Sequence, residues 1–416
     1  MEQARGPVVA GIDTHKKKHA LCLLDGWGRK TFESFFSADE KGYAEIAEAI
    51  GNPEDCIVVG IEGTMSYGAG VCRYLVEKGY PVVEVLGPES ARKKKGANKD
   101  DLKDAERAAR TAIAGDHVSV PKSGSGWVEG VRALMAARRL AVKTSTAATN
   151  AVKALLVTAP EPVKAKYAGM DTESMMKSLS RKRTKEDPIQ NALYDSLRSL
   201  ARMWNEAREQ VDALESEIED LMNENAPALM AMEGCGAVTG AQLAITAGDN
   251  PERMKSKSSF AALCGVSPVE ASSGEKVRHR LNQGGDRQAN CALTQIVLSR
   301  MQHDERTKAY VAKRRAQGRS KKEIKRCLKR YVANEAYRIL LNPKDVPDWQ
   351  GSELAKTRKT LGLTQRDAAS LLLVSQAKIS EIERGGRRYL KLEKQYSEAL
   401  QQLQAKRILD EKTDAA

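Results

Sequence analysis

The chain has 416 residues, and its 68 Lys and Arg against 55 Asp and Glu give a net charge of +13, a balance that attracts polyanions. Its 7 Cys are scattered without a paired C-x-x-C spacing, no apolar leader stretch is present, and no apolar run is long enough for a bilayer. These features argue against a disulfide scaffold, a structural zinc site and a membrane protein, and they favour a cytoplasmic location.

Residues 1–125 are predicted to form an α/β domain, the first of two or three domains expected from the length of the chain. The hydrophobic pattern predicts strands over residues 8–13, 20–25, 30–34, 57–62 and 81–85, and helices over residues 38–50, 69–78 and 99–114. Three antiparallel strands followed by alternating helices and strands favour a mixed sheet. This order of elements fits an RNase H-like domain.

Four acidic residues in this domain are candidates for catalysis. Asp13 and Glu62 each close an apolar strand, and Asp101 and Asp104 have the spacing that places two side chains on one helix face. Carboxylates gathered closely raise one another's pKa unless cations lie among them, and Mg²⁺ is the usual cation. Two such ions clamp the attacking and leaving oxygens of a phosphoryl transfer. The acids therefore predict phosphodiester chemistry on a polynucleotide.

Basic runs at residues 16–18, 92–95, 181–183 and 313–330 point to the same kind of partner. A single run is most simply a solvated face, but four runs, two of them beside the acidic motifs, favour nucleic acid. Aromatic residues make up only 5% of the chain, so backbone contact is expected rather than base stacking as the main mode. The candidate contacts before residue 350 are Lys16, Arg278, Arg280, Lys321, Lys322, Lys325 and Arg326.

Residues 126–228 are predicted to be helical. Amphipathic patterns run over residues 131–157 and 192–225. The second pattern has imperfect heptads, so an intramolecular helical hairpin and a dimerising coiled coil both remain open. The stretch from Tyr167 to Pro188 is predicted to be a flexible connection between the two helices.

Residues 229–345 hold a second group of candidate residues. The small-residue turn at 233–239 precedes an apolar helix and has a form that exposes backbone N–H groups to phosphate. Ser272 and Ser273 lie beside Gly274 and are followed by Arg278 and Arg280. This segment is most simply a turn. Alternatively, a serine there supplies a nucleophile for a covalent link to DNA, with the arginines stabilising the phosphorane charge.

Residues 350–416 resemble a Cro/repressor-type helix-turn-helix. Thr364 and Ser375 are predicted to cap its two central helices, and Leu373 stands where glycine is common at the turn. Gln376, Lys378, Ser380 and Arg384 are expected to face the major groove of DNA. A helical bundle that binds another protein is the alternative. The expected core consists of Leu354, Leu361, Ala368, Leu372, Val374, Ile379 and Ile382.

Taken together, residues 7–340 resemble the DEDD transposases of bacterial insertion sequences. These transposases are relatives of the pilin-gene invertase and are described as bridge-RNA-guided serine recombinases. The motifs that carry the resemblance are 11–16, 60–64, 98–105, 138–150 and 234–285. The resemblance implies an RNase H-like (RuvC-like) domain with the four acids, a coiled coil, and a transposase domain with a catalytic serine. Ser272 is preferred over Ser273, although Gly274-Glu275 stands where many relatives have Gly-Gly.

These features predict a DNA recombinase of an insertion element, which uses Mg²⁺ held by Asp13, Glu62, Asp101 and Asp104 and a serine nucleophile. Donor and target DNA, a bridge RNA and a homo-oligomer, either dimer or tetramer, are implied by the resemblance, as is a bacterial, nucleoid-associated location. A metal-dependent structure-specific nuclease or resolvase and a non-catalytic DNA-binding regulator are the alternatives.

Overall fold

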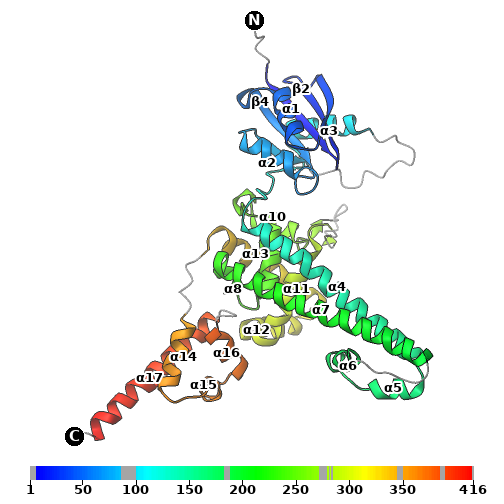
Figure 1. Cartoon of the computed structure of the whole chain (residues 1–416). Helices are drawn as coiled ribbons and strands as arrows, with labels where there is room; N and C mark the ends of the chain where they lie inside the picture. Colours follow the sequence, from blue (N-terminus) through cyan, green and yellow to red (C-terminus); the bar gives the residue numbers. More distant parts are fainter. Residues whose placement is uncertain are drawn as a thin grey trace. The chain divides into compact units, whose positions relative to one another are not determined.

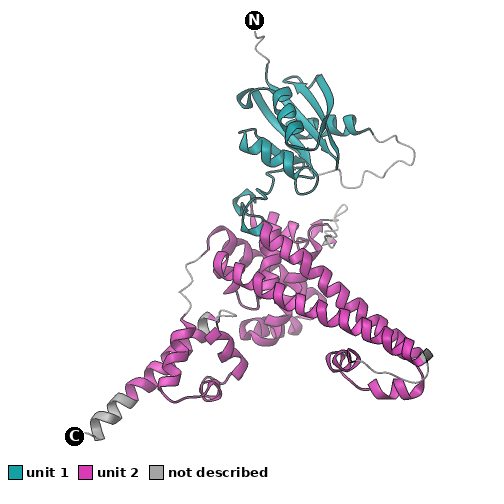
Figure 2. Ribbon diagram, in the orientation of Figure 1, with its two compact units in different colours: residues 1–128, 247–255 teal, residues 129–246, 256–416 magenta. Residues whose placement is uncertain are grey.

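The protein divides into two compact units in the computed structural model (Figures 1 and 2). The first contains residues 1–128 and 247–255, and the second contains residues 129–246 and 256–416. The structure describes residues 6–85, 100–181, 188–270, 279–280, 282, 284–343, 350–384 and 389–414. None of the helices in these ranges is both long and apolar enough to cross a membrane.

The first unit contains a six-stranded sheet with the order β3-β2-β1-β4-β5-β6. Its β1, β2 and β3 form an antiparallel meander, β4 and β5 extend the sheet in parallel to β1, and β6 closes the far edge antiparallel to β5. The prediction of a mixed sheet is thus confirmed. The strands are β1 (Val8–Thr14), β2 (Lys18–Asp25), β3 (Lys30–Ser37), β4 (Cys56–Glu62), β5 (Val82–Val85) and β6 (Val118–Ser119).

Helices cover both faces of this sheet. Alternation along β1 directs Ala10 and Ile12 toward α1 (Glu40–Ile50) and α2 (Ala69–Glu77), where they join one core. Val9 lies on the other face, with Ala105 and Ala109 of α3 (Asp101–Ala114). The unit is therefore a three-layer α/β structure. A short helix, η1 (Pro53–Asp55), precedes β4.

Two glycines allow α3 to approach the sheet closely. Gly11 and Gly60 are paired across β1 and β4. A Cβ on Gly11 would lie 2.1 Å from the Ala105 carbonyl oxygen, and a Cβ on Gly60 would lie 2.7 Å from the Ala108 carbonyl oxygen. Because neither strand has a side chain there, the alanine face of α3 rests directly on the backbone of the sheet.

The second unit begins with a pair of long helices, α4 (Trp127–Thr158) and α7 (Pro188–Asn225), which run side by side (Figure 1). Val152 of α4 shares a core with Leu197 of α7, and Arg138 donates to Glu215 at 2.8 Å. Since both helices belong to one chain, the intramolecular hairpin is confirmed. Whether a second copy pairs with it stays a prediction.

The prediction of a flexible connection over 167–188 is wrong for its described part. The chain there forms α6 (Thr172–Leu179), which follows α5 (Glu161–Tyr167). Met176 is fully buried in the core shared with α7. The polar and lysine-containing composition of this segment concealed a short amphipathic helix, because its apolar residues are methionine and leucine spaced for one face.

The rest of the second unit before residue 344 is mainly helical. The long α13 packs against α10 and α11, and a two-stranded antiparallel pair, β7 with β8, interrupts the helices. The elements are α8 (Pro227–Met230), α9 (Ala237–Ala247), α10 (Lys257–Leu263), β7 (Val269–Glu270), β8 (His279–Arg280), α11 (Arg287–His303), α12 (Glu305–Ala316) and α13 (Lys321–Leu341). The short helix η2 (Pro251–Arg253), which lies between α9 and α10 in the sequence, belongs to the first unit.

The described residues of the carboxy-terminal segment form four helices, α14 (Gly351–Thr360), α15 (Gln365–Leu371), α16 (Gln376–Arg384) and α17 (Leu390–Asp414). All seven apolar residues predicted for its core lie in one cluster. The cluster also includes Tyr396 and Leu400 of α17, a helix that the sequence did not predict. Thr364 caps α15 through a reciprocal pair of bonds with Asp367, as predicted.

A buried polar network joins these four helices. The Glu383 carboxylate accepts hydrogen bonds from Arg358 at 2.6 Å, Gln365 at 2.8 Å and Tyr396 at 2.7 Å. Burial alone would raise the pKa of Glu383, but these three donors together outweigh burial and lower it. Each of the four helices supplies one group, so the network fixes how they pack.

Candidate metal and nucleic-acid site

The acidic cluster lies at the carboxyl ends of β1 and β4. These strands are parallel, and the pairing of Ile12 with Ile61 places the next residues, Asp13 and Glu62, at the same edge of the sheet. Asp101 and Asp104 occupy the first turn of α3, which packs on the same strands. Acidic residues are favourable at this end of a helix, and Asp100 caps it by accepting from the Leu102 N–H at 3.2 Å.

The chemistry of the cluster centres on Asp13. This residue is only 8% exposed, and its Oδ2 atom accepts no hydrogen bond from any described residue. Burial raises the pKa of Asp13, His15 opposes that shift, and the charges of Asp104, Glu62 and Asp101 raise it further. All four acids predicted from the sequence therefore lie close enough to interact electrostatically, and a buried carboxylate oxygen among them lacks a donor.

His15 joins the cluster, although the sequence analysis did not include it as a site residue. Its Nδ1 atom lies 3.6 Å from Asp13 Oδ2 and its Nε2 atom 3.7 Å from Asp101 Oδ1. One atom from each of the three residues lies within 4.8 Å of the others, a spacing that could hold a metal ion. The available signal was the short spacing, since His15 lies two residues after Asp13 and directly after the end of β1.

Several predicted basic contacts are described and accessible. Lys16 and Lys17 are exposed in the turn that follows β1, next to the acidic cluster. Lys321, Lys322 and Arg326 are exposed near the start of α13, whereas Lys325 is half-buried. Arg280 is exposed on β8. Accessible cations of this kind suit contacts to phosphate.

Ser272, Ser273 and Arg278 lie outside the described residues, in the sequence between β7 and β8. The base of that hairpin is described and is firmly held. Arg330 donates to Ser258 Oγ at 3.1 Å and to Ser267 Oγ at 2.5 Å, while Asn290 donates to the Gly265 carbonyl at 2.9 Å. Side chains of α11 and α13 thus anchor the turn that enters β7.

In the turn at 233–239, which was predicted to bind phosphate, one backbone N–H group already has a partner within the protein. The Gly236 N–H donates to Thr239 Oγ1 at 2.9 Å, so the turn caps its own helix. The motif at 284–287 is also structural, because Asp286 caps α11 and accepts from Gln242 at 2.9 Å and from Thr246 at 2.7 Å.

The predicted contacts of the carboxy-terminal segment lie on α16. Gln376 and Arg384 are exposed, while Lys378 and Ser380 are half-buried. Gln376 also lines a hollow of about 470 Å³ with Gln365 and Arg366. The start of α15 and the start of α16 therefore open onto one concavity.

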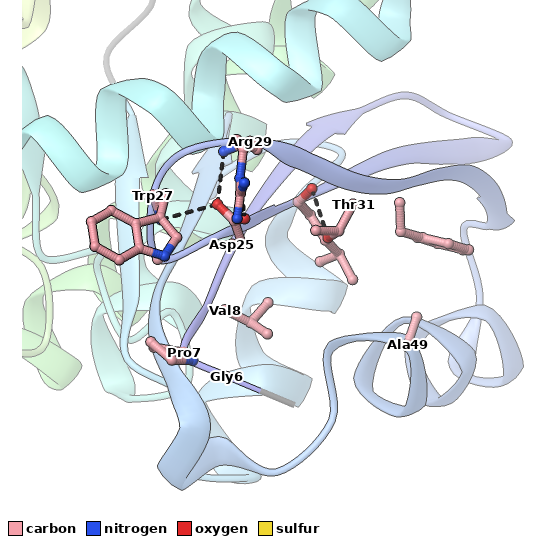
Figure 3. A pocket seen from close by; sticks show the side chains of 11 residues that line it. Gly6, Pro7, Val8, Asp25, Trp27, Arg29, Thr31 and Ala49 are labelled. Carbon is pink, nitrogen blue, oxygen red and sulfur yellow. Dashed lines mark hydrogen bonds and ion pairs between the residues drawn. The ribbon is translucent and has the colours of Figure 1, made fainter. Parts of the chain in front are cut away.

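A larger pocket of about 710 Å³ lies at the other end of the sheet (Figure 3). It is lined by Val8 at the start of β1 and by the β2–β3 turn with Trp27 and Arg29. Asp25 accepts there from the Trp27 N–H at 2.9 Å and from Arg29 at 2.8 Å. This pocket is remote from Asp13, which closes the opposite end of β1, and it holds none of the predicted site residues.

The fold and the cluster together define an α/β protein with a carboxylate site suited to a divalent cation. Residues 10–159 match the family of DEDD transposases of the IS110 type, described as "Transposase", and residues 226–312 match the family described as "Transposase IS116/IS110/IS902 family". The chain belongs to the IS110 family of insertion-element transposases.

A curated relative supports this assignment. The chain is 30% identical over 125 residues to a protein of Streptomyces coelicolor named "Insertion element IS110 uncharacterized 43.6 kDa protein". The aligned part covers 29% of this chain and 31% of that protein, so the chain spans about a third of the length of the curated relative that it matches.

Proposed function

We propose that the protein is a DNA recombinase that mobilises an insertion element, and that its first unit is an RNase H-like (RuvC-like) catalytic domain. The observation that carries the proposal is the gathering of three carboxylates around a fourth, Asp13, whose buried Oδ2 atom has no donor among the described residues. A structural role explains this arrangement poorly, because like charges in a partly buried site destabilise the fold. Membership of a transposase family supports the same function.

The residues present fit a divalent cation such as Mg²⁺. Oxygen donors of carboxylates are the ligands that this ion prefers, and Asp13, Glu62, Asp101 and Asp104 would hold it. Bound there, it would neutralise charge that develops on the scissile phosphate. The chain's own contributions are distinct: α3 fixes two of the acids against the sheet, and Lys16 attracts the DNA backbone to this edge.

The proposed nucleophile is Ser272, with Ser273 as the neighbouring alternative. Its Oγ would form a bond to phosphorus while the bridging P–O bond to the next nucleotide breaks and the released oxygen takes up a proton. Attack by a second strand end would reverse this exchange and rejoin the DNA. Arg280, exposed at the exit of the hairpin, and Arg278 would stabilise the added negative charge.

The proposed partners are donor and target DNA, a bridge RNA and further copies of the chain. The exposed cations of α13, Lys321, Lys322 and Arg326, support binding to a phosphate backbone. Leu140 on α4 is 66% exposed and Met203 on α7 is 50% exposed. If the α4–α7 hairpin of another protomer covered these apolar side chains, the two hairpins together would form a homo-oligomer.

For the carboxy-terminal segment we propose a helix-turn-helix that docks in the major groove of DNA through α16. Gln376, Lys378, Ser380 and Arg384 would make the contacts. The support is the confirmed hydrophobic core and the exposure of Gln376 and Arg384. A bundle that binds another protein is the alternative use of the same helices.

Trapping of a covalent protein–DNA intermediate tests the main proposal. The full chain is incubated with Mg²⁺, an RNA transcribed from the element ends and a labelled DNA junction, and adducts are then separated by denaturing electrophoresis. Adducts are expected with the wild type and not with Asp13→Asn or Ser272→Ala. An adduct that disappears in Ser273→Ala instead would move the nucleophile by one residue.

A metal-dependent nuclease or resolvase is the second candidate, favoured by the completeness of the acidic cluster without the serines. It predicts Mg²⁺-dependent cleavage with no adduct, and full cleavage by the variant that carries both Ser272→Ala and Ser273→Ala. A non-catalytic regulator would need only the carboxy-terminal helices. It predicts unchanged biological activity in Asp13→Asn.

A further inference from the structure

Tyr67 is an exposed aromatic residue beside the acidic cluster. Tyr67 is 57% exposed, and its side chain makes no hydrogen bond or ring contact with the other described residues. Only 5% of the chain is aromatic, and most tyrosines bury the ring against apolar neighbours. Exposure of a single apolar side chain is ordinary, so its significance depends on where the ring is held.

The ring is held by a closed turn. The Gly63 carbonyl accepts from the N–H groups of Ser66 at 2.9 Å and Gly68 at 3.2 Å, and also from Ser66 Oγ at 3.0 Å. Gly63 has a φ of 72°, which favours glycine. The six residues between β4 and α2 therefore form a compact turn, with Tyr67 near its end, and little backbone freedom is left to lose on binding.

This turn directly follows a predicted catalytic residue. Glu62 ends β4, and the Glu62 carbonyl accepts from Thr14 Oγ1 at 2.9 Å, so the turn is joined to the end of β1. A Cβ on Gly68, the residue after Tyr67, would lie 3.0 Å from Thr14 Cγ2. Thr14 itself follows Asp13. The backbone around Tyr67 thus packs against the residue next to the central carboxylate.

Cations complete the surroundings. Lys16 and Lys17 are exposed in the turn that follows Thr14. Cations that hold a phosphate backbone and an aromatic ring that stacks on a base together form the usual pair of contacts to an opened nucleic-acid strand. Asp13 is 8% exposed, so an opened strand, whose phosphates are free to move, suits its carboxylate better than a regular duplex.

We propose that Tyr67 stacks on a DNA base that is unstacked at the cleaved step, and so holds the scissile phosphate at the acidic cluster. The proposal rests on the proposed recombinase function. Stacking of one base on an aromatic side chain is worth about 1–3 kcal/mol by alanine substitution, which corresponds to about 5- to 150-fold. The ring is the active part, because the Tyr67 hydroxyl has no partner among the described residues.

Cleavage of two matched DNA duplexes tests the role of the ring. One duplex spans the element junction with every base paired, and the other carries a single mismatch at the cleaved step, which removes most of the cost of opening it. Tyr67→Ala is expected to slow cleavage of the paired duplex by about 5- to 150-fold. On the mismatched duplex it is expected to approach the wild-type rate, and Tyr67→Phe is expected to match the wild type on both.

Trp27→Ala provides a matched control, because Trp27 is 86% exposed but lies at the opposite end of the sheet (Figure 3). It is expected to cleave both duplexes at the wild-type rate. Wild-type cleavage of the paired duplex by Tyr67→Ala would overturn the proposal, as would an equal loss on both duplexes. A wild-type protein that cleaves neither duplex with Mg²⁺ and an RNA transcribed from the element ends would instead contradict the recombinase function itself.

Discussion

Asp13 illustrates how a functional residue costs stability. Its carboxylate is buried and interacts with three other acids, and no residue that the structure describes donates a hydrogen bond to Oδ2. Burial and this repulsion raise the pKa of Asp13 in the folded protein above its unfolded value. A raised pKa means that the contribution of Asp13 to stability is present at low pH and is lost as the pH rises through the folded pKa. The metal-free protein should therefore be less stable above that pKa.

Asp13→Asn is expected to raise the melting temperature of the metal-free protein at neutral pH. The substitution replaces a carboxylate that is repelled by its neighbours with a neutral amide of nearly the same size. The same variant is expected to lose the additional stabilisation that Mg²⁺ gives the wild type. Calorimetry with and without Mg²⁺ checks both effects. Glu106→Gln on α3 is the control, since Glu106 pairs with Arg110 at 2.8 Å and should keep the Mg²⁺ response. A lower metal-free melting temperature in Asp13→Asn would show that the carboxylate is structural.

Leu373 is a second residue under strain. Its φ of 54° lies in the left-handed region, and its side chain is 93% exposed. Packing of the side chain therefore does not offset the backbone strain. A side chain in this conformation destabilises the folded state by about 1–2 kcal/mol. Glycine removes this strain, but it also raises the entropy of the unfolded chain, which offsets part of the gain in stability. Leu373→Gly is expected to stabilise the carboxy-terminal segment by up to about 1 kcal/mol in urea unfolding.

The control for Leu373 is Gly362→Ala. Gly362 has a φ of 75° and open space around its Cβ position, so only backbone strain changes there. This variant is expected to be destabilising, the opposite sign. If Leu373→Gly also destabilises, the exposed leucine makes a contact in solution that offsets its strain.

At the scale of elements, the position of α3 determines the geometry of the acidic cluster. Asp101 and Asp104 meet Asp13 only because the glycines of β1 and β4 let the helix backbone approach. The sequence predicted the strands, the helix and the acids, since hydrophobic period and charge are local features. It did not predict the roles of Gly11 and Gly60, because close approach depends on what packs opposite them.

Gly11→Ala is expected to displace α3. The new Cβ would lie 2.3 Å from the Ala109 nitrogen and 2.1 Å from the Ala105 carbonyl oxygen, and backbone atoms cannot move aside locally. Overpacking of this kind costs about 1–3 kcal/mol or more, and DNA cleavage should fall further than stability alone explains. Gly130→Ala, where a helical glycine has nothing within 4 Å, should not lower stability. Wild-type cleavage by Gly11→Ala would show that α3 tolerates displacement.

The exposed cations of α13 are predicted to bind phosphates. Each phosphate contact contributes a slope of about −0.9 to the dependence of log affinity on log salt for duplex DNA. Lys321→Gln with Lys322→Gln should therefore make the slope shallower by up to about 2. A fluorescence-anisotropy titration at several salt concentrations measures it, with Lys41→Gln and Lys164→Gln as a charge-matched control. An unchanged slope would assign this run to a solvated face.

At the scale of the whole molecule, local patterns predicted much more than long-range contacts. The mixed sheet and the two long helices followed from periodicity, whereas the core of the last helices followed from the resemblance to a helix-turn-helix. Whether the long helices pair within one chain was left open by the sequence. The return of residues 247–255 to the first unit did not, because it depends on side chains such as Asp249, which accepts from the Val128 N–H at 3.0 Å, and Asn250, which donates to the Pro121 carbonyl at 3.0 Å. Such bonds join residues more than a hundred positions apart and leave no periodic signal.

The carboxy-terminal segment has its own core and polar network, and neither family match reaches it, since the second ends at residue 312. We therefore expect that deletion of residues 350–416 leaves a folded protein that still cleaves a preassembled DNA junction with Mg²⁺, but selects or recruits DNA less well. Competition between junction DNA and unrelated DNA measures that loss. Arg384→Ala with Gln376→Ala in the full chain should reproduce it if α16 contacts DNA. Complete loss of cleavage on deletion, with the fold retained by circular dichroism, would mean that the segment contributes to the catalytic site.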